Sequence, residues 1–309
     1  VEEARPAAPD LAATLGKLPR TARKTLRGIT TGAALLRAEE ANAPLLPPFL
    51  RADTPWRRGA YRVAVDTRVD TRWERRTHHF DTTAATVAQL HRAASSGSSS
   101  ALEGAAPSAP FPSPGGDGAP PSTKPGDQST VHQSPVAVFF PSYAYAEAVA
   151  ELCVNSHHLR IAQQPRGVDL AAQTAFIESS LATHDALFLV LGTGYTEGID
   201  LLGGRITHAM VVGPALPEVN AVQRAKLAHC HAPSRDAAFR LVYQVPGMQK
   251  VNQALGRLVR APGHHATVLL HCRRFAEKSY RDLLDSELQN APALDNDELL
   301  AAWLAGHEF

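Results

Sequence analysis

Apolar runs of strand length alternate with amphipathic segments along the second half of the chain. Strands are predicted at VAVFF (136–140), 159–163, ALFLVL (186–191), ITHAMVV (206–212) and TVLL (267–270). Apolar residues at helical spacing predict helices over 142–152, 169–182, 218–231, 247–260 and 275–284. Upstream, YRVAVD (61–66) predicts another strand and 82–93 another helix. This alternation indicates an α/β fold, in which helices cover both faces of a parallel sheet.

Residues 95–135 interrupt the pattern. Of these 41 positions, 24 are Gly, Pro or Ser, and Phe111 is the only aromatic residue. Such a composition cannot bury enough apolar surface to offset its ordering entropy, so it predicts a disordered segment. The part that precedes it is too small to fold alone. We therefore expect an insertion within one domain, and a hinge between two domains is the alternative.

Charge and cysteine content narrow the function classes. The chain has 309 residues, with 31 Lys+Arg against 30 Asp+Glu, so any nucleic-acid contact must come from a local patch. Three cysteines cannot form a disulfide framework, which favours a reducing, cytoplasmic compartment. No apolar run approaches the ~18 residues of a membrane span. The first residue is Val1, so we expect a piece of a longer protein.

The predicted helix 247–260 carries the clearest candidate chemistry. At 100° per residue, Gln253, Arg257 and Arg260 share one face, and no carboxylate accompanies them. Arginine suits phosphate oxygens because its planar fork donates paired hydrogen bonds and keeps its charge. Gly256 falls inside this helix, where it costs about 1 kcal/mol relative to Ala, which suggests that a ligand or another backbone approaches closely. The alternative is a solvated basic face.

The turn after the strand at 186–191 is a second candidate. It reads GTGYTEGID over 192–200, at the carboxyl end of a predicted parallel strand, where ligands bind in open α/β sheets. A dinucleotide fingerprint would need Gly where the chain has Glu197. The turn is therefore either a different binding loop or merely structural.

Taken together, FFPSY (139–143), TEGID (196–200) and QALGRLVR (253–260) resemble motifs IV, V and VI of the XPD/DinG family of DNA helicases. Similar strings surround them at VVGPALP (211–217), YQVPGMQKV (243–251), RRF (273–275), PPF (47–49) and VDTR (65–68). The resemblance implies a RecA-like domain, the second motor domain of a 5′-to-3′ DNA helicase. It also implies two partners, namely single-stranded DNA and a first RecA-like domain.

The resemblance also implies roles for single residues. Arg257 and Arg260 would be catalytic by contacting the γ-phosphate of ATP. Gln253, Gly198 and Asp200 would face the nucleotide. Ser142, Tyr143, Thr193 and Glu197 would lie along the DNA track. The Mg²⁺ ligands would belong to the first motor domain.

Several family features have no counterpart in the sequence. No GxxxxGK[ST], DEAH tetrad or four-cysteine iron–sulfur arrangement occurs, and TGAAL (31–35) stands where the family has TSATL. His264 and Cys272 stand where the family usually has Asp. These departures favour a C-terminal fragment over a degenerate motor, and they predict that the chain alone hydrolyses no ATP.

The resemblance sets the expected domain boundaries. They are a basic N-terminal segment (1–28), the start of the second RecA-like domain (29–94), the insertion (95–135), the main helicase C-terminal part (136–290) and a helical tail (291–309). The cytoplasmic location would be nucleoid-associated if the protein is bacterial. Two other function classes stay open: a non-catalytic nucleic-acid-binding or interaction module, and a nucleotide-sugar or dinucleotide enzyme that uses the 192–200 turn. Neither a zinc site nor an iron–sulfur cluster is expected from the scattered histidines and cysteines.

Overall fold

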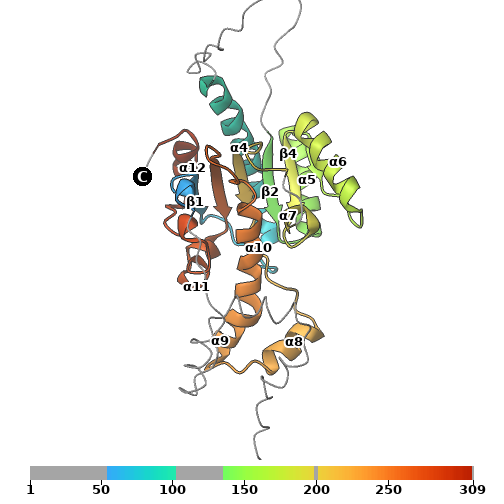
Figure 1. Cartoon of the computed structure of the whole chain (residues 1–309), viewed down its shortest axis with the longest axis vertical. Helices are drawn as coiled ribbons and strands as arrows, with labels where there is room; N and C mark the ends of the chain where they lie inside the picture. The colour runs from blue at the N-terminus through green and yellow to red at the C-terminus, as the bar shows by residue number, and fades with distance from the viewer. Residues whose placement is uncertain (1–53, 102–134, 198–200, 308–309) are drawn as a thin grey trace, which may run out of the picture. The chain divides into compact units, whose positions relative to one another are not determined.

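Seven parallel strands form one sheet in the computed structural model, which describes residues 54–101, 135–197 and 201–307. The strands are β1 (Tyr61–Asp66), β2 (Val136–Phe140), β3 (Ile161–Gln163), β4 (Ala186–Val190), β5 (His208–Val211), β6 (Ala266–His271) and β7 (Ala293–Leu294). They lie in the order β3-β4-β2-β5-β6-β1-β7 (Figure 1). Every ladder is parallel, for example Val138 beside Phe188 and Val63 beside Val268. The predicted α/β class and its strands are confirmed.

Helices cover both faces of this sheet. They are α4 (Phe80–Ala101), α5 (Tyr143–His157), α6 (Leu170–Thr183), α7 (Gly194–Glu197), α8 (Ala221–Ala228), α9 (Arg235–Phe239), α10 (Val245–Leu255), α11 (Lys278–Arg281) and α12 (Asp297–Leu304). A π-helical turn (Arg240–Gln244) leads from α9 into α10. Short 3-10 turns occupy Pro55–Arg57, Arg76–His79, Arg273–Ala276 and Ser286–Leu288. In Figure 1, α8 and α9 lie beyond the sheet, below α10.

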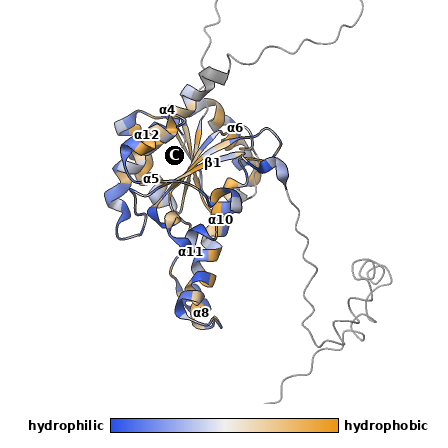
Figure 2. Cartoon of the chain, turned by 90° about the vertical axis from the view of Figure 1, so that its left-hand side faces the viewer, coloured by the Kyte–Doolittle hydropathy of each residue, from blue (hydrophilic) through white to orange (hydrophobic). Residues whose placement is uncertain are grey.

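Alternate residues of each strand pack into two separate cores. Phe139 of β2 joins the core beneath α6, α7 and α10, whereas Val138 and Phe140 join the core beneath α4, α5 and α12. Successive strand side chains point to opposite faces, so a strand covered on both sides must be apolar throughout. This explains why the chain's most apolar runs are its strands, which lie at the centre of Figure 2.

Several predicted helix boundaries are wrong. The helix expected over 275–284 is a 3-10 turn followed by the four-residue α11, and the one expected over 218–231 is confined to α8. Conversely, α4 continues beyond 93 to Ala101, into the segment predicted to be disordered. The hydroxyls of Ser95 and Ser96 bond to the carbonyls of His91 and Arg92, one helical turn back, so serine is compatible with the helix here. Residues 102–134 lie outside the described part.

A buried ion pair fixes β1 against β6 and α12. Asp66 accepts hydrogen bonds from Arg68 Nε (2.9 Å) and His271 Nδ1 (2.7 Å), and Arg68 also pairs with Asp297 at the beginning of α12. Thr83 of α4 lies 3.0 Å from the other ring nitrogen of His271. Burial alone would raise the pKa of Asp66, but the neighbouring His271 and Arg68 hold that pKa far below its usual value. The VDTR string is thus a structural junction.

A buried glutamine joins the carboxyl ends of three strands. Gln164 directly follows β3 and is 6% exposed. Its Oε1 accepts the N–H of Val190 at 2.7 Å, and its Nε2 donates to the Tyr143 hydroxyl at 2.6 Å. The Thr193 hydroxyl lies 3.3 Å from the same Oε1. We call Ser142, Tyr143, Gln164 and Thr193 the C-terminal rim, because they directly follow β2, β3 and β4.

We expect Gln164→Ala to loosen this rim. The substitution leaves the buried Val190 N–H without its acceptor, which costs about 1–3 kcal/mol in the free energy of unfolding. Urea denaturation measures this cost, and hydrogen exchange should be faster at the Val190 amide. Gln163→Ala is the matched control, since Gln163 is the neighbouring residue in β3 and its side chain is exposed. Equal stability of the two variants would contradict the bridging role.

The stability of the fold should also depend on pH through His208, the first residue of β5. Burial, together with the nearby charge of Arg62, lowers the pKa of His208 from 6.5 to about 4. Between these values the unfolded chain binds a proton that the folded chain excludes, so stability falls as pH drops from about 6.5 towards 4.

The unmodified chain should lose free energy of unfolding between pH 7 and pH 4.5, and His208→Gln should lose about 2–3 kcal/mol less. Urea unfolding at the two pH values measures both losses. The exposed His265→Gln should follow the unmodified chain. Identical pH dependence in all three proteins would disprove the assignment.

Candidate functional site

Two of the proposed DNA-track residues, Tyr143 and Thr193, come together at the C-terminal rim. Their hydroxyl groups both approach the side-chain amide of Gln164. Ser142 is the N-cap of α5, and its Oγ accepts the Tyr145 N–H at 3.4 Å. Parallel strands end at one edge of a sheet, so residues distant in sequence meet there. Sequence reasoning missed Gln164, since no periodicity marks it.

The glycine-rich turn after β4 is held by Thr196, the first residue of TEGID. The Thr196 hydroxyl accepts the N–H groups of Gly192 at 3.1 Å and Thr193 at 3.3 Å. The Thr193 hydroxyl lies 2.7 Å from the Val190 carbonyl oxygen, to which it donates. These amide donors are therefore used within the turn, which argues against a backbone phosphate cradle there. Gly198 and Asp200 lie outside the described residues, as does the side chain of Glu197.

The candidate arginines do not lie on a helix. α10 ends at Leu255 with Gly256 as its C-cap, so the prediction that Gln253, Arg257 and Arg260 share one helical face is wrong. After Gly256 the hydrogen bonds reach back only three residues, from the Arg257 and Leu258 N–H groups to the carbonyls of Ala254 and Leu255, so the helix tightens into a turn. Gly256 meets only the backbone of its own helix, with the Asn252 carbonyl oxygen 3.1 Å from an added Cβ. The close approach inferred from this glycine is not observed.

Residues 256–260, which we call the arginine turn, pack against the segment that follows TEGID. A Cβ added at Gly203 would lie 2.9 Å from Arg260 Cγ and 3.3 Å from the Arg257 carbonyl oxygen. The Gly204 N–H donates to the Leu258 carbonyl at 3.2 Å. The sequence-predicted arginines thus lie a few residues from the TEGID segment. Arg257 is half-buried, whereas Arg260 and Gln253 are exposed.

His264 supports the arginine turn from the other side. Its Nδ1 accepts the Arg260 N–H at 3.3 Å, and its ring occupies the space that a side chain at Gly204 would need. Gly204 has φ +71, a backbone conformation that favours glycine. The histidine found where the family usually has Asp therefore fixes the geometry of this turn.

Cys272 is the other residue that stands where the family usually has Asp. It is fully buried and accepts a hydrogen bond from the Thr71 hydroxyl at 3.2 Å. Arg274 donates to the same hydroxyl at 2.9 Å. Within the described residues no carboxylate lies within 4.0 Å of Arg274. The cysteine thus belongs to a buried polar contact.

The rim and the arginine turn lie at opposite ends of the parallel strands. The Leu255 carbonyl at the end of α10 accepts the hydroxyl of Tyr61, the first residue of β1, at 2.9 Å. The arginine turn is therefore near the amino-terminal ends of the strands, whereas the rim is at their carboxyl ends. Among the described residues, Arg257 and Arg260 are therefore separated from Ser142, Tyr143 and Thr193.

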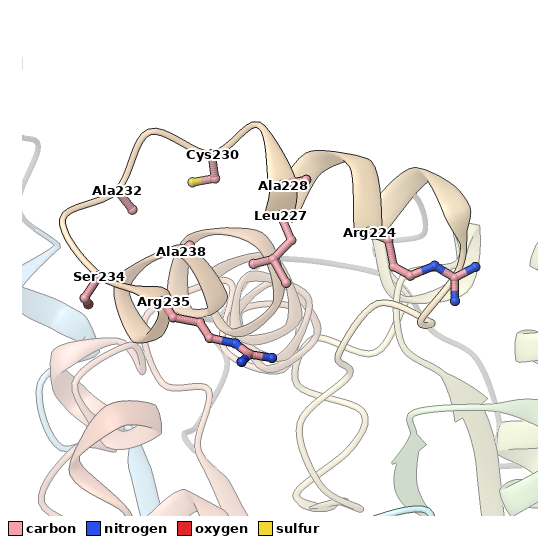
Figure 3. Close-up of a pocket in the computed structure, with 8 residues that line it drawn as sticks. All are labelled: Arg224, Leu227, Ala228, Cys230, Ala232, Ser234, Arg235 and Ala238. Carbon is pink, nitrogen blue, oxygen red and sulfur yellow. The ribbon is translucent and has the colours of Figure 1, made fainter.

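A groove of about 410 Å³ between α8 and α9 contains none of these candidate residues. Leu227, Cys230 and Ala238 line it, with Arg224 and Arg235 beside them (Figure 3). Among the described residues, no group of three or more His, Cys, Asp or Glu side chains could hold a metal ion. Nor does the described part contain a helix long and apolar enough to cross a membrane.

Comparison with known proteins gives the family. The model of the helicase C-terminal domain matches residues 127–291, more than half of the chain. A solved structure named XPD helicase aligns with a TM-score of 0.54 and 15% identity, over 76% of this chain and 35% of its own. A second, named XPD apo, gives 0.52 and 15%, over 77% and 40%. The chain therefore spans well under half the length of these structures, whose RecA-like fold it shares. It belongs to the helicase C-terminal domain family, as its motifs predict.

Proposed function

We propose that this chain is the second motor domain of an ATP-dependent 5′-to-3′ DNA helicase. In this proposal Arg257 and Arg260 reach ATP that is bound mainly by another RecA-like domain, and the C-terminal rim forms part of the single-stranded DNA track. The observation that carries the proposal is the packing of the arginine turn against Gly203 and Gly204. This contact joins the QALGRLVR motif to the segment that directly follows TEGID.

The chemistry expected of the arginines is charge stabilisation. Negative charge spreads over the γ-phosphoryl oxygens during transfer, and a guanidinium held beside them stabilises that state more than bound ATP. His264 and Gly204 hold the backbone of the turn in place, so Arg260 needs little reorganisation to reach a phosphate. Gln253 is exposed two residues before the end of α10, where it can contact the same nucleotide.

The distance between the arginine turn and the C-terminal rim fits a division in which the first contacts ATP and the second contacts DNA. A nucleotide between two domains and a polynucleotide crossing them occupy different surfaces of each domain. The non-catalytic nucleic-acid module remains the second candidate, because the rim alone would serve it. The two differ in whether the arginine turn acts on ATP.

The chain by itself should hydrolyse no ATP, because its sequence has neither GxxxxGK[ST] nor a DEAH tetrad to bind phosphate and Mg²⁺. Phosphate release by residues 1–309 should equal the buffer rate with and without single-stranded DNA. DNA-stimulated release by this chain would contradict the proposal.

In a protein that joins this chain to a first motor domain, Arg257→Ala and Arg260→Ala should each lower DNA-stimulated kcat by about 10³–10⁵. ATP affinity should stay within roughly tenfold, as for groups that act mainly in the transition state. Arg92→Ala is the control, since this exposed arginine lies on α4, on the other face of the sheet. If the arginine variants instead retained turnover and lost only DNA affinity, the non-catalytic module would be favoured.

A further inference from the structure

Lys250 of α10 lies across the turn that follows β4. A Cβ added at Gly192 would be 2.7 Å from Lys250 Cε and 2.9 Å from its Nζ. Gly192 has φ +78, so a side chain here would be strained as well as obstructed. The first glycine of the turn therefore makes room for a lysine. Sequence reasoning assigned no role to Lys250, which is just one polar position on an amphipathic helix.

The ammonium group of Lys250 has no hydrogen bond or ion pair within the described residues. The side chain is half-buried and Gly192 beside it is exposed. Holding a lysine against a turn in this way restricts a flexible side chain, which costs conformational entropy. An anionic ligand would offset that cost.

A cation beside Tyr143 is already neutralised. Arg166 pairs with Glu147 of α5 and stacks on the Tyr143 ring, with its guanidinium carbon 4.4 Å from the ring centroid. The N–H groups of Gly192 and Thr193 are used by the Thr196 hydroxyl. Lys250 is thus a positive group beside the rim that no described carboxylate neutralises.

Lys250 is well separated from the arginine turn. Seven residues divide it from Arg257, which is about 10 Å along a helix axis. Lys250 meets Gly192 at the carboxyl end of β4, whereas Arg260 meets Gly203 near the opposite edge of the sheet. Lys250 and Arg260 thus contact different segments of the domain, and a polynucleotide can supply a separate phosphate to the rim.

We propose that Lys250 binds a backbone phosphate of single-stranded nucleic acid at the C-terminal rim. This inference rests on the proposed function and extends its nucleic-acid track to a residue outside the three motifs. Thr193 and Tyr143 border the same site. Gly192 is required because it lets the lysine lie over the turn.

The test is binding of a 20-nucleotide oligothymidine to the full 309-residue chain as salt is varied. Removing one phosphate contact should make the log–log salt slope less steep by about 0.7, the value for single strands. Lys250→Gln should therefore show that change and bind roughly five- to tenfold more weakly at 0.1 M salt. Lys226→Gln, which removes the same charge from an exposed position on α8, should leave both quantities unchanged.

Gly192→Ala should reproduce the Lys250→Gln effect, and the double variant should add nothing further, because both changes remove one contact. If the unmodified chain binds the oligothymidine and Lys250→Gln binds it with the same salt slope and the same affinity, the inference fails and the proposed track stands. If the unmodified chain does not bind, the track and the inference fail together. If Lys250→Gln instead weakens binding of the non-hydrolysable ATP analogue AMP-PNP and spares the oligothymidine, the phosphate belongs to a nucleotide and the assignment is overturned.

Discussion

The packing of α10 onto the sheet is the constraint on which the rest of the site depends. Met248, Val251, Ala254 and Leu255 are almost completely buried in the core beneath this helix. Burying a larger apolar side chain of this kind contributes about 1.5–3 kcal/mol, so the helix has one stable position and rotation. That position directs Lys250 towards the turn after β4 and places the arginine turn beside Gly203.

The fold could be predicted from the sequence because parallel strands covered on both faces must be continuous apolar runs, such as VAVFF and ALFLV. The positions of Arg257 and Arg260 beyond the end of α10 could not be predicted in this way. The apolar spacing continues through Leu258, so periodicity extends the helix past its end. The missed signal was Gly256, the C-cap of α10, since glycine is the poorest helix former after proline and is common where helices end. The ends of helices depend on competition between local helical spacing and tertiary packing.

The roles of Gln164 and Lys250 could not be predicted for a different reason. Each acts through contacts with residues 21 to 58 positions away along the chain, and neither belongs to a motif. Their partners are identified only once the strand order is known. The glycines illustrate the same limit. In the structure Gly192 and Gly203 make room for Lys250 and Arg260, contacts that no spacing in the sequence predicts.

In the proposed motor, coupling between nucleotide and nucleic acid would involve the domain as a whole. The rim, α10 and the arginine turn are joined through one close-packed core, and such cores do not deform continuously. The backbone of the arginine turn therefore cannot shift while the rim stays in place, unless α10 breaks its packing. In the proposed motor, closing on a nucleotide moves Arg257, Arg260 and Lys250 together as one rigid body. A phosphate held by Lys250 would move with them, and the step along the strand would equal the motion of this domain relative to its partner.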